Sequence, residues 1–226
     1  MDPNLNNFYN LLFDIKDVFI SSLNQYGGVI ENSDESHHIG FENITWGSDI
    51  FKKAHVNIID LIDVKGIWMM HCCIYPNSNN SAPIFGFDIF AGKSKITGCF
   101  HDFSPVIPNH PLSSWFSQES KQLSWNKKRQ LPDWALPIFS DDIIAVGNVQ
   151  NINEIEQILS VISKNIHTYL SYLKTNSETF DDITNKHIFY ISQQRLNPHN
   201  PKILENIGLT SEEALHYINN ILFPDD

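Results

Sequence analysis

The stretch Ile84-Phe85-Gly86-Phe87-Asp88-Ile89-Phe90 is apolar except for one glycine and one acid. Successive side chains of a β-strand point to opposite faces of a sheet, so alternate residues share a face. The odd-numbered residues therefore occupy one face, and Asp88 lies on the other among apolar neighbours. Gly86, on the same face as Asp88, removes a side chain and leaves room for another group to approach the backbone. The pattern predicts a buried strand that carries one titratable group.

The preceding strand-like segment, residues 67–75, repeats this arrangement. By the same alternation, His71 shares a face with Met69, Cys73 and Tyr75. An Asn-rich turn separates the two segments, and so short a connection favours antiparallel neighbours, because a parallel crossover needs a dozen or more residues. Two neighbouring strands are therefore expected to offer one titratable group each.

The rest of the chain shows either strand-like or helical spacing of its apolar residues. Strands are expected at residues 55–63, 67–75, 84–91, 96–103 and 143–149, and helices at residues 5–26, 111–125, 153–173, 181–194 and 211–222. Thr210 and Glu213 predict a capping box at the start of the last helix. Residues 29–46 are polar and irregular. This order predicts an α/β fold, a three-layer α/β/α sandwich with a central antiparallel sheet, in a single domain over residues 1–226.

The composition argues against several classes of partner. The chain has 226 residues and a net charge of −11, which disfavours nucleic acid and anionic membranes, since both require a positive surface. No run of about 18 apolar residues occurs, and the N-terminal residues lack the features of a signal peptide, so a soluble, cytoplasmic protein is expected. The three cysteines show no ligand spacing, which predicts buried thiols and no metal site.

Asp88 and His71 allow two interpretations. In the simpler one, Asp88 caps a turn or pairs with a lysine, and His71 is a core histidine whose hydrogen bonds are satisfied. In the functional one, the two side chains meet. A carboxyl desolvated by an apolar ligand favours its protonated form, and a neighbouring imidazole can share or relay that proton near neutral pH.

Several motifs, in order and with matching spacings, carry a resemblance to a known family. They are Met70-His71-Cys72-Cys73-Ile74-Tyr75-Pro76, Pro83-Ile84-Phe85-Gly86-Phe87-Asp88, Asp102-Phe103-Ser104-Pro105, Arg129-x-Leu131-Pro132-Asp133-Trp134, Ile138-Phe139-Ser140-Asp141, and Tyr190-x-Ser192-Gln193-Gln194 with Asn197. Together they resemble the ferredoxin-dependent bilin reductases over roughly residues 50 to 206. Within that family the chain is most similar to the phycocyanobilin-forming branch.

The resemblance implies an enzyme that holds biliverdin between its sheet and its C-terminal helices and reduces it without a bound flavin or metal. Reduced ferredoxin supplies the electrons singly, through radical intermediates of the pigment. Asp88 is then the central proton donor, and His71 hydrogen-bonds or protonates a terminal ring. The substrate-binding positions implied by the family pattern are Asn57, Thr97, Arg129, Asn197, His199 and Ile203.

Three of these positions invite a more specific expectation. Arg129 matches a family arginine that clamps a propionate, a role suited to the two-pronged guanidinium, although the residue alone also fits an exposed loop cation. Thr97 stands where the family has a propionate-binding serine. His199 stands where the family has a lysine.

Asn57 departs from the phycocyanobilin-forming branch, which carries a glutamate there. That glutamate is the acid implicated in reducing the D-ring vinyl group, and an asparagine amide cannot deliver a proton. The expected reaction is therefore a four-electron reduction of biliverdin IXα to phycoerythrobilin through 15,16-dihydrobiliverdin. The second aspartate used by phycoerythrobilin-forming relatives is absent from residues 197–200, which leaves Asp88, His71, His199 or a water as the A-ring proton source. This combination resembles the compact reductases carried by marine phages.

Two alternatives remain open: reduction of biliverdin to phycocyanobilin despite Asn57, and a non-catalytic bilin-binding carrier. Because ferredoxins are acidic, the resemblance also implies a basic docking face on a chain whose net charge is negative. Lys93, Lys127 and Lys128 are candidate contacts, and association should weaken with salt. We expect the protein to be a monomer.

Overall fold

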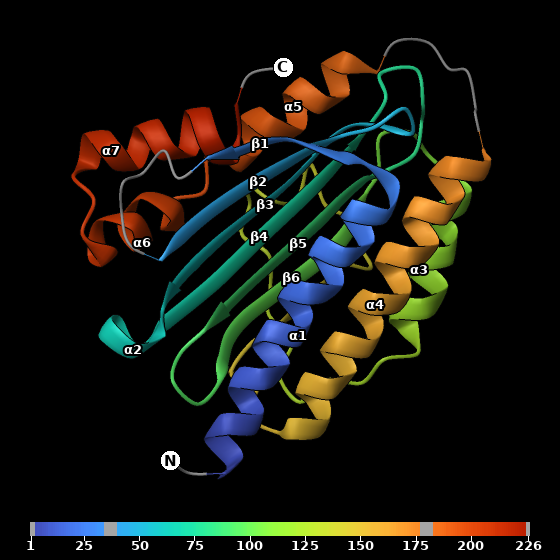
Figure 1. Ribbon diagram of the computed structural model, residues 1–226. Helices are drawn as coiled ribbons and strands as arrows, with labels where there is room; N and C mark the ends of the chain where they lie inside the picture. The colour runs from blue at the N-terminus through green and yellow to red at the C-terminus, as the bar shows by residue number, and fades with distance from the viewer. Residues whose placement is uncertain (1–2, 34–39, 177–182, 225–226) are drawn as a thin grey trace.

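The computed structural model describes residues 3–33, 40–176 and 183–224. Within them, seven strands form one antiparallel sheet whose spatial order, β1 to β7, repeats the order of the chain. Each strand therefore pairs with its neighbour in the sequence, as short connections favour. Figure 1 shows the sheet as a twisted layer with helices on both sides.

The strands are longest in the middle of the sheet and shortest at its β7 edge. Their bounds are β1 (Gly28–Ser33), β2 (Phe41–Gly47), β3 (Phe51–Leu61), β4 (Ile67–Pro76), β5 (Ile84–Ala91), β6 (Ile96–Ser104) and β7 (Ile144–Val146). The predicted strands at residues 67–75, 84–91 and 96–103 are confirmed to within one residue.

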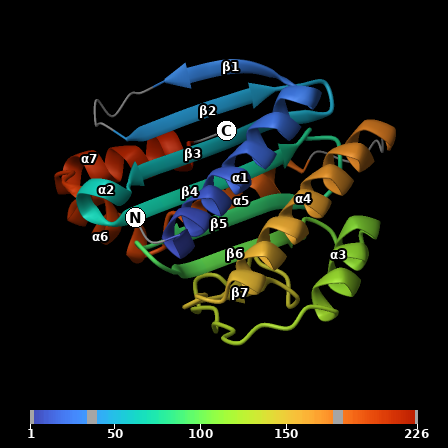
Figure 2. The same ribbon diagram turned by 60° about the horizontal axis from the view of Figure 1, so that its bottom comes forward.

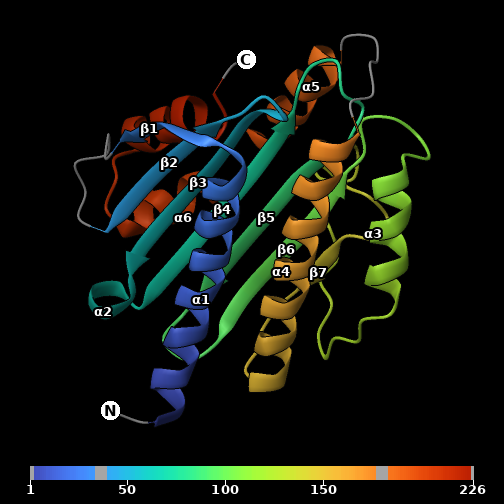
Figure 3. The same cartoon turned by 45° about the vertical axis from the view of Figure 1, so that its right-hand side comes forward.

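Helices cover both faces of the sheet, as the three-layer prediction required. One face carries α1 (Pro3–Tyr26), α3 (Pro111–Lys121) and α4 (Ile152–Thr175), and the other carries α5 (Thr184–Gln194), α6 (His199–Ile207), α7 (Ser211–His216) and the π-helical turn η1 (Tyr217–Leu222). The short α2 (Ile62–Lys65) joins β3 to β4. Figure 2 shows α1 and α4 on the near side of the sheet, and Figure 3 shows them lying along the strands side by side.

The alternation in residues 84–90 separates two hydrophobic cores. Phe85 and Phe87 point towards α1, where their ring centroids lie 6.0 and 4.9 Å from that of Phe19. Each such fully buried side chain contributes on the order of 1.5–3 kcal/mol through the hydrophobic effect. Ile84, on the opposite face, belongs to a second core with Tyr190 and residues of α6 and α7. The first face is the closed core, and the second holds the site described below.

Residues 28–33 and 41–47 correct the prediction of an irregular stretch, since they form β1 and β2. The prediction was wrong because Asn43 and Thr45 are polar residues on a buried strand face. The alternation of apolar side chains that marks a strand is therefore missing from the sequence. β3 also begins four residues before the predicted start, at Phe51 instead of residue 55.

The helices differ from the predictions chiefly at their ends. α3 ends at Lys121, earlier than predicted, and α6 was not predicted at all. The last helix changes from α to π geometry at Tyr217. The capping box of Thr210 and Glu213 is confirmed, with both reciprocal hydrogen bonds formed. The helix predicted from residue 181 starts in a stretch outside the described residues. In the described ranges, no helix combines the length and apolar character needed to cross a membrane.

Candidate active site

A single row of side chains crosses the sheet from β2 to β6. The strand register places Asn43 opposite Asn57, Asn57 opposite His71, His71 opposite Asp88, and Asp88 opposite Phe100. Directly opposed residues on antiparallel strands have Cβ atoms about 4.5–5.5 Å apart, so each side chain lies beside the next. We call these five residues the cross-strand row. Its polar members meet because the strands pair in chain order.

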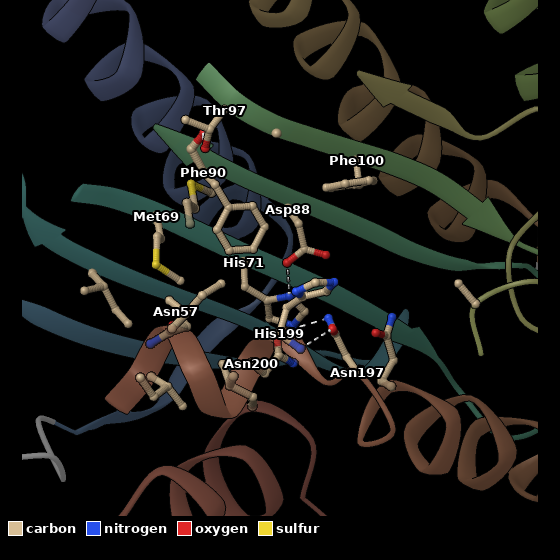
Figure 4. Close-up of a pocket in the computed structure, with 18 of the residues that line it drawn as sticks. Asn57, Met69, His71, Asp88, Phe90, Thr97, Phe100, Asn197, His199 and Asn200 are labelled. Carbon is tan, nitrogen blue, oxygen red and sulfur yellow. Dashed lines mark hydrogen bonds and ion pairs between the residues drawn. The ribbon is translucent and has the colours of Figure 1, made fainter. Parts of the chain in front are cut away.

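A cavity of about 750 Å³ lies between the cross-strand row and the C-terminal helices. The residues predicted for catalysis or substrate binding all line it: Asp88, His71, Asn57, Thr97, Arg129, Asn197, His199 and Ile203. Figure 4 shows Asp88 and His71 projecting from neighbouring strands, with Asn197 and His199 on the helical side. The volume is typical of a site for a small molecule or cofactor. The structure thus brings the predicted residues together, while their individual roles stay predictions.

His71 and Asp88 form a hydrogen-bonded pair beside this cavity, with Nδ1 of the histidine 2.8 Å from Oδ1 of the acid. The side chain of His71 is 9% exposed and that of Asp88 is 29% exposed, so the carboxyl is the more open member. Burial alone would lower the pKa of His71, but the neighbouring Cys73 and the Asp88 carboxylate outweigh it and raise that pKa well above its usual value. The pair therefore holds a proton near neutral pH.

A second histidine, His55, lies beside the pair and stays neutral. Its ring centroid is 6.0 Å from that of His71. Burial lowers the pKa of His55 well below its usual value, and nearby His71 and Lys53 lower it further. Nδ1 of His55 and Nε2 of His71 are both buried, and neither has a hydrogen-bond partner within the described part of the chain. Since buried polar atoms are normally satisfied, two hydrogen-bonding positions are open here.

The end of the described chain covers His71. The ring of Phe223 meets the imidazole edge to face, with centroids 5.2 Å apart, and Leu222 and Phe223 both line the cavity. Arg195 holds this segment: its Nε donates to the backbone oxygen of Phe223 at 2.9 Å, and its Nη2 to that of Asn219 at 3.1 Å. An apolar cover excludes water and so strengthens the interaction between His71 and its acid.

Arg129 and Thr97 lie together in the cavity wall. Nη2 of Arg129 donates to the backbone oxygen of Thr97 at 2.5 Å, and the guanidinium lies 5.8 Å from the ring centroid of Phe100. The hydroxyl of Thr97 donates to the backbone oxygen of Phe90 at 3.0 Å. A Cβ at Gly147 would stand 2.3 Å from Nε of Arg129, so glycine is required for this placement. A guanidinium held in this way presents a charged fork that suits a carboxylate.

The opposite wall is built by α6 and the residues before it. Oδ1 of Asn197 accepts a hydrogen bond from the backbone N–H of His199 at 3.0 Å, and its Nδ2 donates to Oδ1 of Asn200 at 3.1 Å. These local bonds commit the Asn197 amide to the turn that starts α6. His199 is exposed and Ile203 half-buried, and both face the cavity.

Several cavity residues were missed by the sequence predictions. Met69, Phe90 and Phe100 come from the sheet, and Trp134 and Phe139 come from the loop before β7. Nε1 of Trp134 is buried without a hydrogen-bond partner in the described ranges, so it offers a donor to a ligand. Trp134 and Phe139 belong to motifs that carried the family resemblance, and these motifs could have predicted their position in the cavity. For the sheet residues, only the face they share with Asp88 and His71 indicated this position.

The space above Gly86 is used, as its sequence context predicted. A Cβ there would lie 3.2 Å from the hydroxyl of Tyr190 on α5. That hydroxyl accepts a hydrogen bond from Nε2 of Gln194 at 2.8 Å. Glycine therefore lets α5 pack closely on the sheet at the end of the cavity.

The cysteines are buried thiols, as predicted. Burial raises the pKa of Cys72 and of Cys99, which keeps both protonated and unreactive. Across residues 3–33, 40–176 and 183–224, no group of three or more His, Cys, Asp or Glu side chains is placed to hold a metal ion.

Comparison with known proteins identifies a family for this arrangement. The model of the family described as ferredoxin-dependent bilin reductase matches residues 21–224. Phycocyanobilin:ferredoxin oxidoreductase of Trichodesmium erythraeum is 22% identical over 203 residues, which cover 87% of this chain and 81% of that protein. The protein of the same name from Synechococcus elongatus is 23% identical over 203 residues, covering 87% and 80%.

Two solved structures are similar to this one. The structure of a protein named PcyX is 25% identical, with a TM-score of 0.70, and the match covers 95% of this chain and 99% of the other. Phytochromobilin synthase from tomato, solved in complex with biliverdin, is 16% identical with a TM-score of 0.71, covering 92% and 82%. This second likeness concerns the fold alone.

Proposed function

This chain belongs to the ferredoxin-dependent bilin reductase family, and from that premise we propose that it reduces biliverdin IXα to phycoerythrobilin through 15,16-dihydrobiliverdin. The conversion adds four electrons and four protons to the tetrapyrrole. Reduced ferredoxin supplies the electrons one at a time, through radical forms of the pigment and with no flavin or metal bound in the protein. One observation carries the proposal: in the cross-strand row, a proton-holding pair of His71 and Asp88 stands beside an asparagine instead of an acid.

Asp88 is the proposed proton donor to the bilin. Its carboxyl is more exposed than the imidazole of His71, so it is the member of the pair that reaches a ligand. A flat apolar ligand in the cavity removes water from the carboxyl and favours its protonated form. His71, whose raised pKa keeps it charged near neutral pH, then resupplies the proton. Protonation of the conjugated system makes it easier for a one-electron donor to reduce.

Asn57 is the proposed determinant of the product. It lies next to His71 in the cross-strand row and lines the cavity. An acid in this position would deliver a proton to the ring beside it, whereas an amide does not titrate and cannot do so. Protonation from Asp88 and His71 then leads to the 15,16 methine bridge and afterwards to the A-ring diene. This reasoning supports phycoerythrobilin over phycocyanobilin, whose formation requires reduction of the D-ring vinyl group.

Arg129 and Thr97 are the proposed anchor for a propionate of the bilin. The guanidinium stands over Phe100, itself the neighbour of Asp88 in the row. A carboxylate held there fixes which carbon of the tetrapyrrole faces Asp88, and such positioning supports selective protonation. Asn197, His199 and Ile203 line the opposite wall.

Ferredoxin is the proposed electron donor, docking on basic residues near the cavity. Lys93, Lys127 and Lys128 are exposed. The side chain of Lys93 lies against Gly66, which lines the cavity, and Lys128 directly precedes Arg129. Positive charge near the bound pigment attracts ferredoxin, which is an acidic protein. We further propose that the enzyme is monomeric, cytoplasmic and of the phage type that its sequence resembles.

A second candidate function is reduction of biliverdin to phycocyanobilin. The relatives named phycocyanobilin:ferredoxin oxidoreductase, whose matches cover 87% of this chain, favour it. Under this alternative, a group other than residue 57 protonates the D-ring vinyl side. The substitution of asparagine for the acid weighs against it.

Identification of the product tests the proposal. The chain is incubated without oxygen with biliverdin, ferredoxin and an electron source, and the product is identified by chromatography. Phycoerythrobilin supports the proposal, and phycocyanobilin contradicts the role given to Asn57. Tight binding of biliverdin with no loss of its absorption on addition of reduced ferredoxin identifies a carrier. The Asn57→Glu variant, which restores an acid, is expected to divert product towards phycocyanobilin.

A further inference from the structure

The side-chain amide of Asn57 uses its hydrogens inside the protein. Its Nδ2 donates to Oδ1 of Asn43 at 2.8 Å, to the backbone oxygen of Glu42 at 3.2 Å, and to the hydroxyl of Tyr217 in η1. An amide nitrogen has two hydrogens, so these three acceptors fully occupy it. Asn57 Oδ1 has no hydrogen-bond partner among the described residues, and the residue lines the cavity.

The backbone oxygen of Glu42 decides which way this amide is turned. A carbonyl oxygen only accepts hydrogen bonds, so the group facing it must be the nitrogen of Asn57. The reversed amide would place its own oxygen 3.2 Å from that carbonyl, with two acceptors facing each other, which is costly at a residue only 4% exposed.

Asn43 holds the network together from β2. Its Oδ1 accepts from Nδ2 of Asn57 at 2.8 Å and pairs with Nε2 of His55 at 3.2 Å. His55 stays neutral and so carries a single ring hydrogen, and since Asn43 Oδ1 only accepts, that hydrogen lies on Nε2. Asn43, His55 and Tyr217 are all buried, so none of them has water as an alternative partner.

We propose that Asn43 and Tyr217 are positioning residues that fix Asn57 with its carbonyl oxygen towards the cavity, as an acceptor for a ring N–H of the bound tetrapyrrole. This inference rests on the proposed function, because it takes the ligand to be a linear tetrapyrrole. Oδ1 of Asn57 thereby favours a ligand that places an N–H at this position. A ring carbonyl there is disfavoured, since its oxygen and Oδ1 are both acceptors. Asn43 acts only through Asn57 and touches no ligand.

The inference is tested by a double-mutant cycle on the affinity for biliverdin. The affinity is measured by absorbance titration in the absence of ferredoxin. Loss of one hydrogen bond to the ligand is expected to weaken binding roughly three- to tenfold in Asn57→Ala. Asn43→Ala is expected to weaken it by a similar factor and to alter the absorption spectrum of the bound pigment. In the double variant the two effects should not multiply, because both remove the same contact.

Asn165→Ala provides a matched control on the opposite face of the sheet. Asn165 is also a buried asparagine bonded to a histidine, in this case through Nδ2, which lies 2.9 Å from Nε2 of His101. Its loss should destabilise the fold as Asn43→Ala does while leaving biliverdin affinity and spectrum unchanged. Should Asn43→Ala fail to fold, Tyr217→Phe removes the other acceptor and carries the same expectation against Asn57→Ala.

The outcomes separate this inference from the proposed function. Effects of Asn43→Ala or Tyr217→Phe that multiply with those of Asn57→Ala, or wild-type affinity in both variants, overturn the inference. Non-multiplying effects support it even if the product is phycocyanobilin or no reduction occurs, and those two results overturn only the proposed product or activity. A chain that does not bind biliverdin overturns both.

Discussion

His101 and His71 are buried on opposite faces of the sheet, and the two imidazoles are held in opposite protonation states. His101 of β6 points into the closed core, where Nδ1 donates to the backbone oxygen of Gly86 at 2.8 Å and Nε2 accepts from Asn165 at 2.9 Å. Burial lowers the pKa of His101 to about 4. His71 of β4, on the cavity face, is also buried, yet its pKa is raised.

The difference shows that burial alone does not make a functional histidine. His101 has only neutral partners, both nitrogens are satisfied, and the ring serves as a polar link in an aromatic core. His71 has a carboxylate on one nitrogen and no partner within the described residues on the other. A charged partner and an unfilled hydrogen-bonding position together distinguish a site from a structural contact.

The largest expected effect comes from removing the acid of the cavity face. Asp88→Asn keeps the shape of the side chain but cannot donate the proton, so reduction of biliverdin should slow by about 10²- to 10⁴-fold while binding is retained. The rate is measured as loss of biliverdin absorption with reduced ferredoxin, and binding by titration. Full turnover by this variant would remove Asp88 from the mechanism.

Replacing each histidine by leucine should separate the two faces. His71→Leu is expected to reduce the rate about a hundredfold or more with little change in stability, because Asp88 remains partly solvated. His101→Leu leaves the Gly86 carbonyl and the Asn165 amide unpaired in the core, so unfolding free energy should fall by about 1–3 kcal/mol at unchanged activity. Denaturant unfolding measures the stability of the two variants, and the reduction assay measures their activity. If both variants lost activity equally, the contrast between the faces would fail.

Acid should reduce the stability that His101 provides. The unfolded residue titrates near 6.5 and the folded one near 4, so between these values only the unfolded state binds the proton. Stability therefore falls as pH drops through this window, by up to about 3 kcal/mol. The difference in unfolding free energy between wild type and His101→Leu should shrink accordingly. Asp102, whose pKa burial raises to about 6, acts in the opposite direction but equally in both proteins.

The smallest expected effect concerns the docking of ferredoxin. Lys127→Ala with Lys128→Ala should raise the KM for ferredoxin roughly two- to fivefold at low salt, with kcat retained, because exposed charges act mainly on association. Added salt should remove the difference. Lys174→Ala is the control, since this cation stacks on Tyr26 on the closed side of the sheet. An equal response from the control would show a nonspecific effect of net charge.

The sequence predicted the sandwich and the face of Asp88 well because both depend on local alternation. It did not reveal Asn43, since this polar residue lies in a strand that carries no apolar alternation. α6 was missed because Pro198 and Pro201 interrupt its helical pattern. The contacts of Tyr217 and Phe223 with the row depend on packing between distant segments, which no local pattern encodes. The predicted binding residues were found together largely through motifs spread along the chain.

The chain-order pairing of the strands also bears on how this protein is made. Contacts between sequential neighbours close short loops, so the sheet from β1 to β6 can assemble hairpin by hairpin as it is synthesised. The cross-strand row is then complete by Ser104, before any of the helices α3 to α7 has left the ribosome. The packing of helix α1 is complete only when α4 has been synthesised, and the elements from α5 to η1 cover the cavity last. A chain arrested at mid-length exposes the cavity face of the sheet and the part of the opposite face that α3 and α4 cover, so it is more prone to aggregate than the complete chain.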